Sequence, residues 1–287
     1  MIQPIRLLTL LCVALLTTTA CAQGNSFDSN GIQIQYYDRG GTGQPVVLVH
    51  GGFSDAAMWD ELDVTTALTN AGFRVIAFDM RGYGRSEPKP HDHSAYGYEM
   101  SHDIARLLNH LQICKTHVIG YSQGAIVANR FRAKHPDRLL SVTLACAGAL
   151  CTDSVWVRRA NEFADAIVRR DLAPIVHALT PPEQDPSTDE MIRDLYQTLS
   201  STNDMKAAAA STRAQGIPDS IDELRANRIP TLAIIGEADP NIMDVKWMAG
   251  VMRNINVVTI PSAGHNDALN HPIFNREVVA FLEAHRK

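Results

Sequence analysis

The pentapeptide Gly120-Tyr121-Ser122-Gln123-Gly124 constrains the fold of this chain more than any other feature. Residues 116–119 before it are β-rich, and residues 125–131 after it favour a helix. A serine between a strand and a helix takes a strained backbone conformation, and flanking glycines let the chain bend there without a clash. The pattern therefore predicts a sharp turn that raises the Ser122 hydroxyl above a sheet.

Such a turn has a chemical consequence for the Ser122 hydroxyl. A serine hydroxyl is a poor nucleophile until a base takes its proton and an anion site surrounds the reacting group. The N-terminus of the following helix offers free N–H groups for a developing negative charge. A nucleophilic serine on this turn requires an Asp or Glu and then a His later in the chain.

Both partners occur in that order. Residues 231–236 form an apolar run followed by Glu237-Ala238-Asp239-Pro240, and residues 256–260 form another, followed by Pro261-Ser262-Ala263-Gly264-His265. Open α/β sheets place their sites beyond the carboxyl ends of their strands, so both segments are expected near Ser122. We expect His265 to accept the serine proton and Asp239 to orient the imidazole.

Other carboxylates compete with Asp239 for that role. Glu237 precedes it by two residues, and Asp244 lies five residues after it. Asp153 follows an earlier strand-like run, at residues 139–145, and is a further candidate. The turn directly after a strand favours Asp239.

An early loop is the candidate oxyanion hole, the pair of N–H groups that holds the negative oxygen. Residues 45–49 predict a buried strand that ends in His50-Gly51-Gly52-Phe53. One donor is the N–H of the residue after the nucleophile, Gln123, and the second comes from this loop. Gly52 is the first choice for that donor and Phe53 the second, whereas His50 is expected to be structural.

Strands alternate with helices along most of the chain. This order predicts an α/β fold with a mainly parallel, twisted sheet and helices on both faces. Residues 31–150 and 218–287 are assigned to that core, and residues 151–217 to a helical insertion without strand-like runs. Further strands are expected at residues 32–38 and 74–78, and helices at residues 55–70, 96–111, 155–179 and 189–214, with a proline-rich break at residues 181–186.

Taken together, these segments resemble the α/β-hydrolases of the serine esterase type, a group that includes arylesterases, enol-lactone hydrolases, cofactor-free haloperoxidases and carbon–carbon bond hydrolases. The resemblance rests on the pentapeptide and on residues 49–52, Trp59, residues 79–86, 236–239 and 263–265. It departs from the common pattern at Ala125, where many relatives carry glycine. The serine nucleophile argues against the epoxide hydrolases and haloalkane dehalogenases of this fold, which use aspartate.

The resemblance implies hydrolysis of a carboxylic ester or lactone of a small molecule, without a cofactor. It also implies that the insertion is a helical cap over the active site, in which Trp156 could line an acyl pocket. Amide, peptide or carbon–carbon bond cleavage is the alternative, and an aminopeptidase could use Glu162 or Asp165 to hold an amine. A non-catalytic binding protein is a third possibility, although such proteins usually lose a member of the triad.

The first 22 residues predict an export signal, because Arg6 precedes an apolar run at residues 7–16. Ala20-Cys21-Ala22 fits cleavage before Gln23, whereas residues 19–21 resemble a lipobox that would place a lipid anchor on Cys21. We therefore expect a periplasmic or secreted protein that meets a membrane only through such an anchor. Residues 25–30 are expected to form a polar linker.

Charge and metal-binding patterns narrow the range of partners. The net charge of −5 gives no reason to expect nucleic acid as a partner. His91-Asp92-His93 resembles a metal-ligand fragment, but no further ligand at a fixed spacing completes it, so no metal is expected. After the leader, Cys114, Cys146 and Cys151 remain, and either the last two pair or all three are small buried apolar residues.

Overall fold

A computed structural model of the protein describes residues 25–180 and 188–286. The predicted export signal, both interpretations of Cys21 and the proline-rich break at residues 181–186 lie outside the described residues. Within the described part, no helix is both long and apolar enough to cross a membrane.

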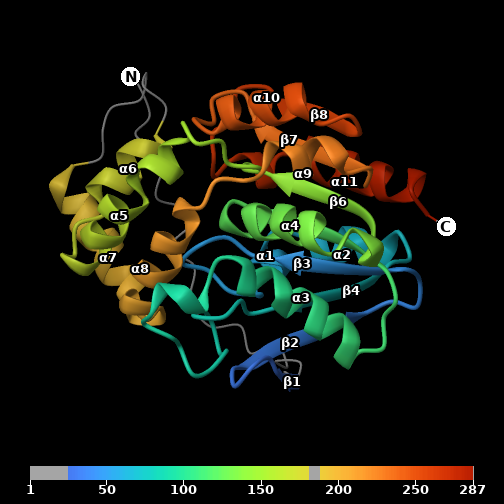
Figure 1. Ribbon diagram of the computed structural model, residues 1–287, viewed down its shortest axis with the longest axis horizontal. Helices are drawn as coiled ribbons and strands as arrows, with labels where there is room; N and C mark the ends of the chain where they lie inside the picture. The colour runs from blue at the N-terminus through green and yellow to red at the C-terminus, as the bar shows by residue number, and fades with distance from the viewer. Residues whose placement is uncertain (1–24, 181–187, 287) are drawn as a thin grey trace.

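One sheet organises the described residues (Figure 1). Its strand order is β1-β2-β4-β3-β5-β6-β7-β8. Strands β1 and β2 run antiparallel to their neighbours, and the pairs from β4 through β8 are parallel. The strands are β1 (Asn25–Asp28), β2 (Gln33–Gly40), β3 (Pro45–Val49), β4 (Arg74–Phe78), β5 (Thr116–Tyr121), β6 (Leu139–Ala145), β7 (Thr231–Gly236) and β8 (Ile255–Ile260).

Helices cover both faces of the sheet, as the alternating sequence pattern predicts. Alternate residues of β3 face opposite sides, so Val47 and Val49 join one apolar core while Val46 and Leu48 join the other. The first core includes side chains of α3 (Tyr98–His110), α4 (Gln123–Lys134), α9 (Ile221–Ala226) and α10 (Ile242–Val251). The second includes side chains of α1 (Met58–Glu61), α2 (Val64–Asn70) and α11 (Pro272–Ala284). The predicted α/β fold class is confirmed.

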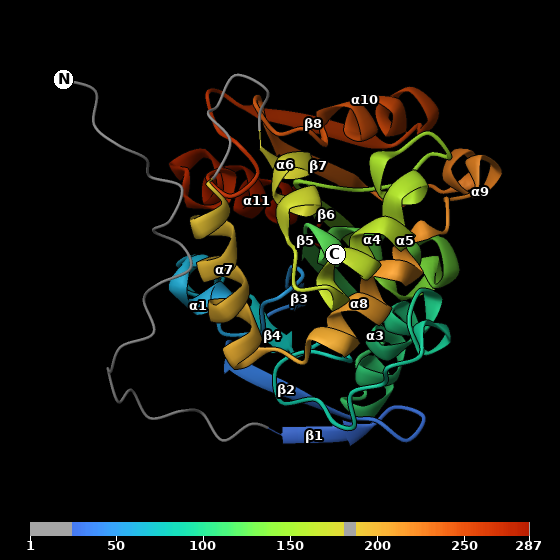
Figure 2. The same ribbon diagram turned by 90° about the vertical axis from the view of Figure 1, so that its left-hand side faces the viewer.

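The remaining α-helices belong to the insertion and have an apolar cluster of their own, which includes Phe163, Ile167 and Ile192. Figure 1 shows them at the end of the sheet toward which β6 runs, and Figure 2 views the molecule from that side. They are α5 (Val155–Val168), α6 (Ala173–Leu179), α7 (Asp189–Thr202) and α8 (Met205–Arg213). Short 3-10 helices lie at His93–Ala95, Pro136–Arg138, Ala214–Gly216 and Ala268–Asn270.

Four expectations from the sequence are wrong in detail. The expected polar linker at residues 25–30 contains strand β1, because Phe27 is buried and stacks on His110, which lies far away in the sequence. The helix expected at residues 55–70 is divided into α1 and α2, because Asp63 takes a left-handed conformation with φ 56°.

The helix expected at residues 155–179 is divided into α5 and α6, because Arg170 takes a left-handed conformation with φ 64°. The helix expected at residues 189–214 is divided into α7 and α8, because Asn203 and Asp204 have an extended backbone.

The cysteines that lie in the described residues are free. The alternative in which Cys146 and Cys151 pair is therefore wrong. The expectation of burial holds for Cys146, whereas Cys151 is half-buried and Cys114 is exposed.

The buried His117 side chain gives folding stability a specific pH dependence. Its Nδ1 lies 2.7 Å from Ser141 Oγ, and burial lowers the pKa of His117 to about 4. As the pH falls from about 6.5 to about 4, the unfolded chain binds a proton at this position before the folded chain does. The folded state should therefore lose on the order of 3 kcal/mol of stability across that window from this residue alone.

Urea unfolding of the wild type and of His117→Asn at pH 7 and pH 4.5 checks this expectation. The variant should be less stable at pH 7, but its free energy of unfolding should fall less on acidification. Equal losses in the two proteins would contradict the assignment.

Candidate active site

The turn at Ser122 depends on two very close approaches of the backbone. A Cβ atom at Gly120 would lie 2.2 Å from the carbonyl oxygen of Gly124, and one at Gly124 would lie 2.2 Å from that of Val49. Helix α4 therefore begins almost in contact with the end of β3. Ser122 itself, between β5 and α4, has φ 52° and ψ −120°, a conformation rare for a residue with a side chain.

The structure brings Ser122 together with two residues from distant turns. Nε2 of His265 lies 3.0 Å from Ser122 Oγ, and Nδ1 of His265 lies 2.9 Å from Asp239 Oδ2. Asp239 follows β7, His265 follows β8, and both side chains are buried. This arrangement can move the serine proton to the imidazole while the carboxylate holds the ring.

The three competing carboxylates lie elsewhere. Glu237 accepts a hydrogen bond from the N–H of Ser262 at 3.2 Å. Asp244 accepts one from the hydroxyl of Ser154, and Asp153 is exposed.

The surroundings of Asp239 include two residues, Asn241 and Cys146, that the sequence analysis did not assign to the site. The backbone N–H of Asn241 donates to Asp239 Oδ1 at 2.9 Å. Burial and then the charge of Asp239 raise the pKa of the Cys146 thiol well above its usual range, so this thiol is protonated beside the carboxylate. The sequence offered one signal for each residue: Asn241 lies two residues after the acid Asp239, and Cys146 directly follows strand β6.

The side chain of His50 forms hydrogen bonds that fix the loop after β3. Nε2 of His50 accepts a hydrogen bond from the N–H of Met80 at 2.9 Å, so Nδ1 carries the proton and donates to Gly51 O at 2.7 Å. Burial lowers the pKa of His50, which keeps the ring neutral. These contacts agree with the structural role expected for this residue.

Asp79, the first residue after β4, also forms hydrogen bonds to the loop after β3. Its Oδ1 accepts from the N–H of Ala56 at 2.9 Å, and its Oδ2 accepts from the N–H of Arg85 at 2.8 Å and the hydroxyl of Tyr37 at 3.1 Å. One buried carboxylate thereby joins the loops that follow β3 and β4.

Gly52 and Gln123, the two expected oxyanion donors, are neighbours. A Cβ atom at Gly52 would lie 2.8 Å from Gln123 Oε1. That oxygen accepts from the hydroxyl of Tyr83 at 2.9 Å, and Nε2 of Gln123 donates to Ser211 Oγ at 2.5 Å. The Gln123 side chain therefore connects the start of α4 to helix α8 of the insertion.

The insertion also contacts Phe53, the second choice of donor. Nδ2 of Asn203, between α7 and α8, donates to the carbonyl oxygen of Phe53 at 3.3 Å. Phe53 has φ 57°, so the insertion holds a strained residue of the loop after β3.

Two groups of residues contain side chains of the kind that bind metals. Ligand atoms of Cys146, Asp239 and His265 lie within 4.8 Å of one another. The imidazole already bridges Asp239 and the serine, which favours proton transfer at this position. Of the His91-Asp92-His93 fragment, His91 instead pairs with Asp204 at 2.9 Å.

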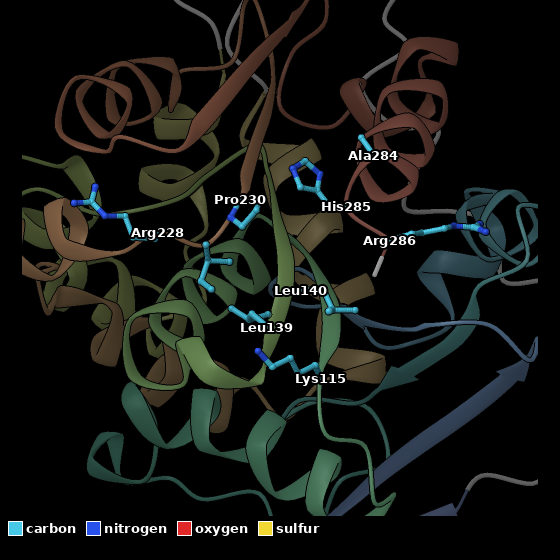
Figure 3. A pocket seen from close by; sticks show the side chains of 9 residues that line it. Lys115, Leu139, Leu140, Arg228, Pro230, Ala284, His285 and Arg286 are labelled. Atoms are coloured by element: carbon cyan, nitrogen blue, oxygen red, sulfur yellow. The ribbon is translucent and has the colours of Figure 1, made fainter.

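Two surface hollows of the core lie at the ends of the strands opposite to Ser122. One, of about 310 Å³, is lined by residues that include Lys115, Leu139, Pro230 and His285 (Figure 3). Because β6 begins at Leu139 and β7 at Thr231, this hollow lies at the amino ends of the strands. The candidate active site is at the opposite edge.

Comparison with known proteins agrees with this fold. The family described as alpha/beta hydrolase fold matches residues 44–272. A thermophilic esterase from Thermogutta terrifontis has a structure similar to that of this chain, with a TM-score of 0.74 and 30% identity over 93% of this chain and 100% of that one.

Curated relatives extend the comparison. The chain is 27% identical over 223 residues to 3-oxoadipate enol-lactonase 1 of Acinetobacter baylyi, covering 76% of this chain and 80% of the relative. It is 32% identical over 152 residues to the dihydrolipoyllysine-residue acetyltransferase component of the acetoin cleaving system of Cupriavidus necator, covering 53% of this chain but only 39% of the relative. The family match spans most of the sequence, and the chain therefore belongs to the α/β-hydrolase fold family.

Proposed function

We propose that the protein is a serine hydrolase that cleaves a carboxylic ester or lactone of a small molecule. The observation that carries this proposal is the chain of contacts from Ser122 Oγ through His265 to Asp239, with distances of 3.0 and 2.9 Å. Membership of a hydrolase family and similarity to proteins named as an esterase and an enol-lactonase support it.

The reaction proceeds in two halves. Nε2 of His265 takes the proton of Ser122 as Oγ attacks the carbonyl carbon, and the N–H groups of Gln123 and Gly52 stabilise the negative oxygen. The imidazolium then protonates the leaving alcohol, which leaves an acyl group on the serine. Water then attacks this acyl-enzyme while His265 takes its proton. The bond between the acyl group and Ser122 Oγ breaks, the carboxylic acid leaves, and the imidazolium returns the proton to Oγ. Asp239 orients the ring throughout.

Side chains around the site favour an uncharged acyl group. Phe53 and Trp156 pack against the apolar cluster of the insertion. Glu162 and Asp165, which could have held a substrate amine, are paired with Arg159 and Arg213 on the exposed side of the insertion. Neither of the two carboxylates named for the aminopeptidase alternative is therefore unpaired.

Labelling with a fluorophosphonate, which reacts with activated serines, tests the nucleophile. Mass spectrometry should find one adduct on Ser122, and Ser122→Ala should lose both the adduct and nearly all ester hydrolysis. A decrease in kcat on the order of 10⁵-fold or more is expected, because this substitution removes the attacking oxygen. Ser200→Ala, at an exposed position on α7, is the matched control and should be labelled normally.

An unlabelled wild type would contradict the proposal and favour a non-catalytic binding protein. The same spectrum gives the mass of the mature N-terminus. A start at Gln23 would support the proposed soluble exported form, and a lipid on Cys21 would support the anchored form.

Gly52→Ala tests the oxyanion hole. The new Cβ would meet Gln123 Oε1 at 2.8 Å, and that amide cannot easily move because Tyr83 and Ser211 hold it. Displacement of a donor should lower kcat on the order of a hundredfold while KM changes little. Gly250→Ala, on α10 with open space around it, is the control and should keep full activity.

Steady-state kinetics on a p-nitrophenyl ester measures both constants. An unchanged kcat in Gly52→Ala would contradict the assignment of the Gly52 N–H as an oxyanion donor. The N–H of Phe53 would then be the candidate for the second donor.

A further inference from the structure

We propose that Asn241 is a positioning residue that couples the seating of helix α5 to the Asp239–His265 pair. This inference rests on the proposed function, and it adds a means by which the inserted helices control the catalytic residues. Several hydrogen bonds meet at this one buried residue.

Asn241 uses both its backbone and its side chain at the site. Its backbone N–H occupies Oδ1 of Asp239, which leaves Oδ2 for His265. Its Nδ2 donates to the carbonyl oxygen of Cys146 at 3.0 Å and lies 3.4 Å from Nδ1 of His265. Its Oδ1 accepts from the indole Nε1–H of Trp156 at 3.2 Å.

The chemistry of these partners fixes the orientation of the Asn241 amide. An indole N–H can only donate, so it must face the amide oxygen. A backbone carbonyl can only accept, so the Cys146 oxygen must face the amide nitrogen. Exchanging the two ends would leave both neighbours unsatisfied, and the amide nitrogen is therefore held on the Cys146 carbonyl. Because Nδ1 of His265 donates to Asp239, the amide nitrogen makes no hydrogen bond to the ring, and Asn241 acts on His265 through Asp239.

Trp156 belongs to the insertion, and a second contact joins the same two segments. Ser154 caps the N-terminus of α5, and its hydroxyl donates to Asp244 Oδ2 at 3.1 Å, in the first turn of α10. The Trp156 ring packs edge-on against Phe163 with centroids 4.9 Å apart. The first turn of α5 is thus fastened to the segment after Asp239 at two points.

A movement of α5 would consequently change the positions of Asp239 and His265. When α5 is seated, the indole satisfies Asn241 Oδ1, and the amide braces the turn that carries Asp239. When α5 lifts, that oxygen loses its partner in a buried position, and the amide is free to rotate away from Cys146. Full alignment of His265 is then restricted to the state in which the insertion is closed over the substrate.

A double-mutant cycle with Trp156→Phe and Asn241→Ala tests the coupling. Trp156→Phe keeps an aromatic ring and removes the N–H donor. Each single variant should lower kcat on the order of tenfold, and Asn241→Ala should change KM less than about twofold. Adding Trp156→Phe to Asn241→Ala should lower kcat no further, because the tryptophan acts through the asparagine.

Glu162→Gln is the matched control, because this exposed residue lies on the same helix and its partner is Arg159. It should keep the wild-type kcat. Asn241→Asp is the second variant: it keeps the shape and the acceptor for Trp156, but it loses the donor to Cys146 O. It should lower kcat while thermal unfolding shows a folded protein.

Three results would overturn the inference. They are multiplied losses of kcat in the double variant, a change confined to KM, and a change confined to the melting temperature. Multiplied losses would mean that Trp156 acts independently, for example as part of the acyl pocket. Fluorophosphonate labelling of the wild type is measured in parallel. Failure of that labelling contradicts the proposed function itself, whereas normal labelling with multiplied losses contradicts only the role of Asn241.

Discussion

The close packing of helix α4 against the ends of β3 and β5 is the constraint on which the rest of the site depends. Gly120 and Gly124 allow backbones to approach at distances that any Cβ atom would prevent. This approach forces Ser122 into its rare conformation, and it sets the start of α4 beside Gly52. The strain at one residue is therefore stabilised by the packing of the whole sheet.

Much of this arrangement could be predicted from the sequence because it follows from local rules. A serine between glycines specifies the turn, and apolar runs before Asp239 and His265 specify that these residues follow strands. Parallel strands bring their carboxyl ends to one edge of the sheet. The meeting of the three side chains could therefore be predicted although they lie far apart in the sequence. The structure places them within hydrogen-bonding distance.

The remaining features depend on contacts between distant segments. The polar segment at residues 25–28 forms a strand because Phe27 stacks on His110 of α3. Asn241 and Ser211 read as ordinary polar residues of a turn and a helix, since nothing nearby in the chain indicates their partners. The division of one expected helix at Asp63 likewise reflects a single left-handed residue that composition does not reveal.

The insertion forms hydrogen bonds to three segments of the core around the candidate active site. Asn203 holds the carbonyl of Phe53, Ser211 holds the amide of Gln123, and Trp156 holds the amide of Asn241. The insertion is therefore not an interchangeable module. A chimaera that received the helices of a relative, to import its substrate preference, would inherit a new pocket but lose these three hydrogen bonds. Transplanted helices would need a matching polar side chain at each position to serve this core.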